Sequence, residues 1–174
     1  MLLVVGSGSS ATIRACQRKG GRWVSVLGRM YGHVGLHGVA PPGAKREGDL
    51  RTPGGTFSLG SGFGVLSDPG TWFSWHRTTH ADVWVDDSSS SYYNTRQRDP
   101  ARGRWDSAED LYVPGTYDYV QVIDYNPARI PGRGSAIFLH VDHHGGTTGC
   151  VSLPRSDLLR VFRWERPGVL IVIR

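Results

Sequence analysis

The chain has 174 residues, a length typical of one domain, and its 24 glycines and 10 prolines favour short strands over long helices. Its net charge of +5 at pH 7 favours anionic surroundings, so nucleic acid, cell-wall polymer and acidic membrane are all compatible partners. Two cysteines exclude a disulfide framework, and no apolar run reaches the length of a membrane span.

The first third of the chain predicts consecutive antiparallel strands, because short runs rich in Val, Ile and aromatic residues alternate with glycine turns. These runs are Leu2–Val5, Ala11–Arg18 and Arg22–Met30. Met1–Val5 has no basic leader and no long apolar core, so we expect a strand there and not a signal peptide. The span Gly32–Gly70 is dense in Gly and Pro, which predicts ordered loops around a single strand, Thr56–Leu59.

The rest of the chain predicts a second long loop, central strands, one helix and a closing strand. The loop is Asp86–Arg104, in which interleaved aromatic residues argue against disorder. The helix is Ser156–Arg163, with Ser156 as its N-cap and Pro167-Gly168 as its stop. The strands are Tyr119–Tyr125, Ala136–Val141, Gly149–Leu153 and, as a buried closing strand, Val169–Ile173. We therefore expect one mainly β domain, residues 1–174, with long ordered loops and one short C-terminal helix.

The stretch from His140 to Val151 carries the residues best suited to chemistry, since a strand ends on a histidine and a glycine precedes a cysteine. A free thiol has a pKa of about 8.5 and is mostly protonated at neutral pH, so a nucleophilic cysteine needs a base such as imidazole. The intervening Gly-rich and Thr-rich loop is long enough to bring Cys150 beside His140. Amide groups around Gly149 and Cys150 are then predicted to face the oxygen that becomes negative during acyl transfer.

Two other interpretations of these residues stay open at this point. A cysteine that follows a glycine at the start of a strand is often a small core residue, and we expect Cys16 to be such an inert buried thiol. A zinc site is the second alternative, although the spacing fits no common zinc pattern. Its ligands would come from Cys150, His140, Asp142, His143 and His144.

The segment Thr147-Thr148-Gly149-Cys150-Val151, behind a histidine at a strand end, resembles the signature of YkuD-type L,D-transpeptidase catalytic domains. Thr148 stands where many members have a second histidine, and Ser152 stands where Arg or Asn is common. An independent upstream block, Lys45–Phe57, resembles the Thr-Pro-x-Gly-x-Phe element of the same family. Further similar stretches are Trp84–Asp87, Tyr93-Asn94 and Gly134–His140.

The resemblance implies an L,D-transpeptidase-type β-sandwich and a cysteine acyltransferase that uses no cofactor and no metal. Cys150 is the expected nucleophile and His140 the general base and acid. The backbone carbonyl of Val141 or, alternatively, the Asp142 side chain is expected to orient the imidazole, and Gly149 is the fourth catalytic position. Predicted substrate contacts are Thr147, Thr148, His143, His144, Tyr93, Asn94, Trp84, Lys45 and Arg46, with Trp84 also suited to core packing.

The implied reaction is the formation of 3→3 crosslinks between peptidoglycan stem peptides through a cysteine thioester. Carbapenem-type β-lactams are the expected covalent inhibitors, nucleic acid is not an expected partner, and the expected location is the cell wall or periplasm, with the export signal outside this sequence. Two alternatives remain: hydrolysis of the thioester by water, as in an L,D-carboxypeptidase or amidase, and a non-enzymatic basic module that binds wall polymer or nucleic acid.

Overall fold

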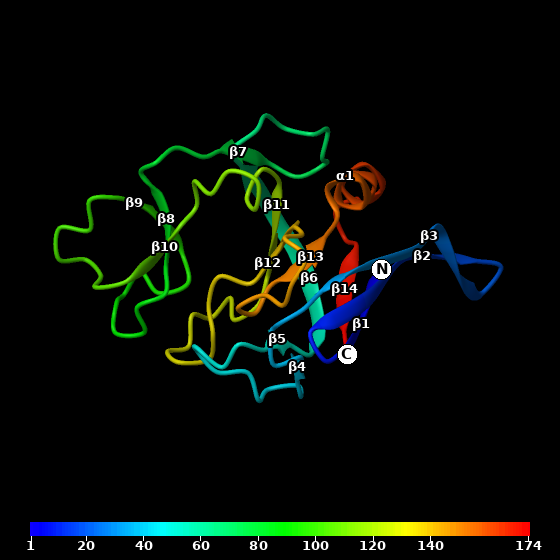
Figure 1. The fold of residues 1–174 in the computed structure, drawn as a ribbon, viewed down its shortest axis with the longest axis horizontal. Helices are drawn as coiled ribbons and strands as arrows, with labels where there is room; N and C mark the ends of the chain where they lie inside the picture. Colours follow the sequence, from blue (N-terminus) through cyan, green and yellow to red (C-terminus); the bar gives the residue numbers. More distant parts are fainter.

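The computed structural model describes residues 1–174, and its main feature is a nine-stranded sheet (Figure 1). The strand order is β11-β12-β13-β3-β2-β1-β14-β6-β7, and β11 also pairs with β6, so the sheet closes on itself. These strands are β1 (Leu2–Ser7), β2 (Ser10–Lys19), β3 (Arg22–His33), β6 (Gly55–Gly64), β7 (Trp75–Arg77), β11 (Val120–Ile123), β12 (Phe138–Val141), β13 (Val151–Leu153) and β14 (Leu170–Ile173). The predicted mainly β fold is confirmed.

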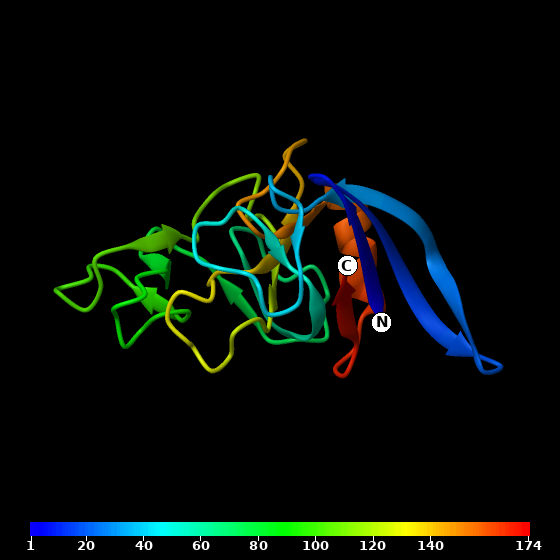
Figure 2. The same cartoon turned by 90° about the horizontal axis from the view of Figure 1, so that it is seen from below.

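The N-terminal strands pair in the predicted antiparallel order, β1 with β2 and β2 with β3. Alternate residues of β1 and β2, such as Leu2, Val4 and Ile13, are fully buried, whereas Val5, the residue after Val4, is exposed. This alternation places one face of the sheet on the core and the other in solvent. The tip of the β2–β3 hairpin extends beyond the body of the molecule (Figure 2).

Strands β12 and β13 are parallel neighbours, and all seven of their residues are buried. Leu139, Val141 and Val151 belong to the main core cluster, while Phe138 and Cys150 belong to a second cluster on the other face. A central position with both faces covered explains why every residue of these strands is buried, the polar residues His140 and Ser152 included. The predicted central strands at these positions are confirmed, although β12 begins at Phe138 and β13 at Val151.

Helix α1 (Arg155–Trp164) packs its apolar side on the main core through Leu158, Val161 and Phe162. The predicted N-cap, Ser156, is wrong: the cap is Pro154, and no side chain caps the helix. The helix starts one residue before Ser156, which therefore lies inside its first turn. As predicted, the helix ends before Pro167-Gly168, at the extended residue Glu165. No helix in the structure is long and apolar enough to cross a bilayer.

The two long segments predicted as loops also contain short strands. Asp86–Arg104 includes β9 (Arg96–Arg98), which pairs with β8 (Asp82–Val85) in a three-stranded sheet completed by β10 (Ala108–Asp110). Within Gly32–Gly70, β4 (Val39–Ala40) pairs with β5 (Thr52–Pro53). Strands of two to four residues are too short to show a period, so the sequence pattern missed them. The three-stranded sheet lies at the end of the molecule opposite the β2–β3 hairpin (Figures 1 and 2).

Candidate active site

Cys150 and His140 lie on the same face of the main sheet: His140 is in β12, and Cys150 directly precedes the neighbouring strand β13. Leu139 pairs with Val151, so Cys150 stands beside Phe138, one side-chain repeat away from His140. Strand spacing and rise put the two Cα atoms roughly 8 Å apart. The ring of Tyr117 contacts that of His140 at 5.5 Å between centroids and shares an apolar cluster with Cys150. The strand pairing thus brings the predicted nucleophile and base onto one surface.

The backbone carbonyl of Val141 orients the imidazole of His140. Its oxygen lies 2.8 Å from Nδ1 of the ring. Because a carbonyl only accepts hydrogen bonds, Nδ1 carries the proton in the neutral ring and Nε2 keeps a free lone pair. Burial lowers the pKa of His140 to about 4, although the hydrogen bond to Val141 acts in the opposite direction. At neutral pH the ring is therefore uncharged and able to accept a proton.

The Asp142 side chain, the alternative orienter, is engaged elsewhere. Its carboxylate accepts hydrogen bonds from Ser152 Oγ at 2.6 Å and from the His144 amide at 2.9 Å, and one of its oxygens lies 2.6 Å from His33 Nδ1. Burial alone would raise the pKa of Asp142, but the hydrogen bonds from Ser152 and His33 outweigh it and lower the pKa. Asp142 therefore ties β12 to β13 and β3 beside the site.

The Cys150 thiol is covered in this structure, since the residue is only 4% exposed. Its sulfur lies 3.3 Å from the Phe138 amide, which donates to it, and 3.3 Å from the Ala136 carbonyl, to which it donates. Burial raises the pKa of the thiol well above its ordinary value, and the charge of Glu109 adds to this, while the Phe138 amide and Lys45 act against it. The thiol of Cys150 and the imidazole of His140 are therefore both neutral at rest.

The backbone around the cysteine is held by hydroxyl groups from two parts of the chain. The Cys150 carbonyl accepts hydrogen bonds from Thr147 Oγ1 at 2.7 Å and from Thr52 Oγ1 at 3.0 Å. The Gly149 amide donates to Thr147 Oγ1 at 3.1 Å, so it is not free, in contrast to what the sequence predicts. The Cys150 amide makes no hydrogen bond within the chain. Of these two amides, only that of Cys150 remains able to donate a hydrogen bond to a developing oxyanion.

Gly149 is required where it stands, because its φ of +152° is unfavourable for other residues. A Cβ at this position would also lie 3.1 Å from the Arg51 carbonyl oxygen, 3.3 Å from Ile137 Cδ1 and 3.5 Å from Lys45 Nζ. The last distance places a buried ammonium directly beside the backbone that precedes Cys150.

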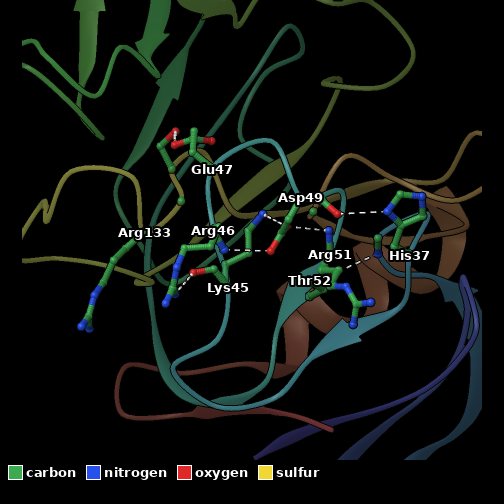
Figure 3. Close-up of polar contacts among 12 residues, drawn as sticks. His37, Lys45, Arg46, Glu47, Asp49, Arg51, Thr52 and Arg133 are labelled. Atoms are coloured by element: carbon green, nitrogen blue, oxygen red, sulfur yellow. Dashed lines mark hydrogen bonds and ion pairs between the residues drawn. The ribbon is translucent and has the colours of Figure 1, made fainter.

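A cavity of about 480 Å³ opens next to this backbone. Lys45 and Gly149 line it, together with Glu47, Asp86, Glu109 and Thr148 among others. Lys45 is only 3% exposed, and its ammonium pairs with Asp49 at 2.5 Å. Figure 3 shows how Asp49 fixes this turn by also accepting from the backbone amides of Arg46 and Arg51. The cavity therefore carries both a cation and carboxylates.

Two residues of the site carry no signal in the sequence, Tyr117 and Glu109. The Tyr117 hydroxyl donates a hydrogen bond to the Glu109 carboxylate. Burial raises the pKa of Glu109 to about 7; the bond from Tyr117 opposes this, and the charges of Asp86 and Glu47 add to it. Neither residue sits in a motif, and only the tertiary fold brings them to the thiol.

The other predicted substrate contacts fall into three groups. Thr148 lines the cavity and Thr147 braces the cysteine backbone. His143 and His144 are exposed on the loop after β12, and Arg46 is exposed and bonds to carbonyls of its own turn.

Trp84, Tyr93 and Asn94 lie beneath the cavity wall instead of in its lining. Tyr93 is 1% exposed and its hydroxyl donates to Glu47 and accepts from the Gly134 amide. Asn94 Oδ1 accepts from Trp84 Nε1 at 2.9 Å and from the Ala136 amide at 3.2 Å. These three side chains therefore hold the segment that precedes β12. No group of three His, Cys, Asp or Glu side chains is arranged to hold a metal ion.

The family model described as the YkuD L,D-transpeptidase catalytic domain matches residues 11–173. The chain belongs to this family. The match spans both the Lys45–Phe57 block and the Cys150 segment, so the resemblance seen in those residues extends to nearly the whole L,D-transpeptidase-type domain. Searches of curated proteins and of solved structures return no match.

Proposed function

We propose that this L,D-transpeptidase-family domain joins peptidoglycan stem peptides by 3→3 crosslinks through a thioester on Cys150. The observation that carries the proposal is the placement of Cys150 and His140 on one sheet face, with Nε2 of the imidazole free to take a proton. The family membership supports the reaction class. The substrate lies in the cell wall, which makes an extracytoplasmic location part of the same proposal.

In the first step His140 Nε2 takes the proton of the thiol as the sulfur attacks the carbonyl carbon of the third stem residue. A sulfur–carbon bond forms, the carbon–nitrogen bond to the terminal D-alanine breaks, and the proton passes from His140 to the departing amine. Moving the proton only at the moment of attack fits a pair that is neutral at rest. The covering side chains around the thiol, such as Tyr117, must shift when the donor enters.

The oxyanion formed in this step is stabilised by a hydrogen bond from the Cys150 amide and by the positive charge of Lys45. The amide is an unused donor at the nucleophile itself. The Lys45 ammonium supplies the positive charge that the engaged Gly149 amide does not, since it lines the same cavity beside Gly149. In a site with little water, such a charge acts on the transition state more strongly than it would in bulk solvent.

In the second step an amine of a neighbouring stem peptide loses one proton to solvent and, in its neutral form, attacks the thioester. His140 takes a proton from that amine, a new amide bond forms, and the sulfur leaves with a proton returned from His140. Water in place of the amine would give hydrolysis, the activity of a carboxypeptidase or amidase. The carboxylates of the cavity, Glu47, Asp86 and Glu109, favour a cationic amine over neutral water as the group that approaches.

The test is product analysis with a tetrapeptide stem, with and without a second stem as acceptor. We expect a crosslinked dimer whose formation depends on Cys150. Tripeptide as the sole product would show that the domain hydrolyses the thioester and does not transfer it to an amine. His140→Ala is expected to slow acylation by about 10²-fold or more, as general-base catalysis usually contributes. A rate within about threefold of wild type would remove His140 as the base.

A further inference from the structure

A second pocket lies on the solvent-facing side of the N-terminal sheet, away from the thiol, and arginines form its walls. It has a volume of about 320 Å³. Its lining comes from β1, β2, β3 and the residue after β14, namely Leu3, Val5, Thr12, Arg14, Arg29 and Arg174. No Asp or Glu side chain lines it.

The three arginines have no partners. None of the three guanidinium groups donates a hydrogen bond or joins an ion pair within the chain. Arg14 and Arg29 are directly opposite each other on β2 and β3, an arrangement of like charges that destabilises a strand pair. The backbone oxygen of Arg174 accepts a hydrogen bond from the Gly6 amide at 2.8 Å, which fixes this residue beside β1. An anionic ligand would relieve this repulsion.

The surroundings of the pocket extend the positive charge. The first 46 residues contain no Asp or Glu, and the first acidic residue is Glu47. From the pocket, the β2–β3 hairpin continues outward with Arg18, Lys19 and Arg22, all exposed (Figure 2). The electrostatic potential around the pocket is therefore positive and attracts anions towards it.

We propose that this pocket binds a phosphate group of an anionic polyol-phosphate polymer of the cell wall. Guanidinium groups bind phosphate oxygens through paired hydrogen bonds, and three of them around one concavity match a group with several charged oxygens. The Thr12 hydroxyl offers a further donor, and the Leu3 and Val5 side chains offer an apolar floor for the carbon backbone of the polymer. Binding here holds the domain at the wall and does not depend on the thiol chemistry.

The test measures the affinity of the folded chain for synthetic poly(glycerol phosphate) by fluorescence anisotropy at several salt concentrations. The double variant Arg14→Gln/Arg29→Gln is expected to bind about tenfold more weakly or worse, because it loses charge-assisted hydrogen bonds, and to show a shallower salt dependence. The matched control is Arg18→Gln/Arg22→Gln, which removes the same charge from the hairpin tip and is expected to stay within about threefold of wild type.

Equal losses of affinity in the two double variants would contradict a specific site at this pocket, since diffuse positive charge would then explain the binding. So would the absence of binding by the wild-type chain. If duplex DNA binds more tightly than poly(glycerol phosphate) at equal phosphate concentration, the wall polymer is not the ligand of this pocket. If polyglutamate binds as tightly as poly(glycerol phosphate), the pocket has no preference for phosphate. Both double variants are expected to keep the wild-type melting temperature and rate of Cys150 acylation, so this proposal and the proposed transpeptidation fail separately.

Discussion

The hydroxyl of Thr52 donates a hydrogen bond of 3.0 Å to the carbonyl oxygen of Cys150, across 98 residues of sequence. The same hydroxyl accepts from the Gly35 amide at 2.7 Å, and Thr52 is fully buried. The upstream Thr-Pro block is thus in direct contact with the backbone of the predicted nucleophile. Its role is to fix the peptide group from which the thiol projects.

Thr52→Val should therefore destabilise the fold by about 1–3 kcal/mol, because it leaves the buried Gly35 amide without an acceptor. Thr52→Ser keeps the hydroxyl and should recover most of this loss. Chemical denaturation of the three proteins measures the difference. If Val and Ser variants unfold at the same denaturant concentration, the hydroxyl does not hold this part of the site.

Lys45→Met should lower the rate constant of acylation at saturating donor by about 10²-fold, the usual effect of removing one group that stabilises an oxyanion. Lys45→Arg keeps the charge, so its rate constant of acylation should lie between those of Lys45→Met and wild type. Arg46→Met is the matched control, since the neighbouring Arg46 is exposed and only contacts its own turn. A reduced affinity for donor with an unchanged rate constant would make Lys45 a binding residue alone.

Alkylation of Cys150 by iodoacetamide should be slower than that of free cysteine at pH 7 and should rise with pH through the neutral range without a plateau. Burial lowers the pKa of His140 to about 4 and raises that of the thiol, so no thiolate–imidazolium pair forms at rest. Peptide mass mapping of the alkylated site gives the rate at each pH. A flat, fast rate between pH 5 and 8 would show a preformed ion pair and contradict the neutral resting state.

Glu165 should make the fold more stable in mild acid than in mild alkali. Burial raises its pKa to about 8, and neither carboxylate oxygen has a hydrogen-bond partner. A group whose pKa is higher in the folded state favours folding when protonated, so this contribution is complete below the unfolded pKa of about 4.5 and is lost as pH rises to 8.

Glu165→Gln should flatten this part of the stability profile and stabilise the fold at pH 8 by a few kcal/mol, since one pKa unit corresponds to about 1.4 kcal/mol. Asp106→Asn, an exposed carboxylate, is the control and should leave the profile as in wild type. Denaturant midpoints between pH 4.5 and 9 measure the effect. Parallel profiles for wild type and Glu165→Gln would exclude a buried neutral carboxyl.

The sequence was sufficient for features that depend on local pattern. The positions of β12 and β13, with His140 in the first strand and Cys150 just before the second, follow from residue types and spacing alone. The presence of Tyr117 and Glu109 in the site could not be predicted, because each reaches the site only through the packing of distant segments. The hydrogen bond from the Gly149 amide to Thr147 Oγ1 could not be predicted either, since it depends on the conformation of the loop. Ser156 was misassigned because Ser is favoured both as an N-cap and elsewhere in turns.

The central claim is that Cys150 is the acylated nucleophile. Intact-protein mass spectrometry after exposure to a carbapenem tests it most directly, with Cys150→Ala and Cys16→Ala as paired variants, since Cys16 is the other, buried thiol. We expect one covalent adduct on wild type and on Cys16→Ala, and none on a folded Cys150→Ala protein. An adduct that persists on Cys150→Ala would contradict the claim.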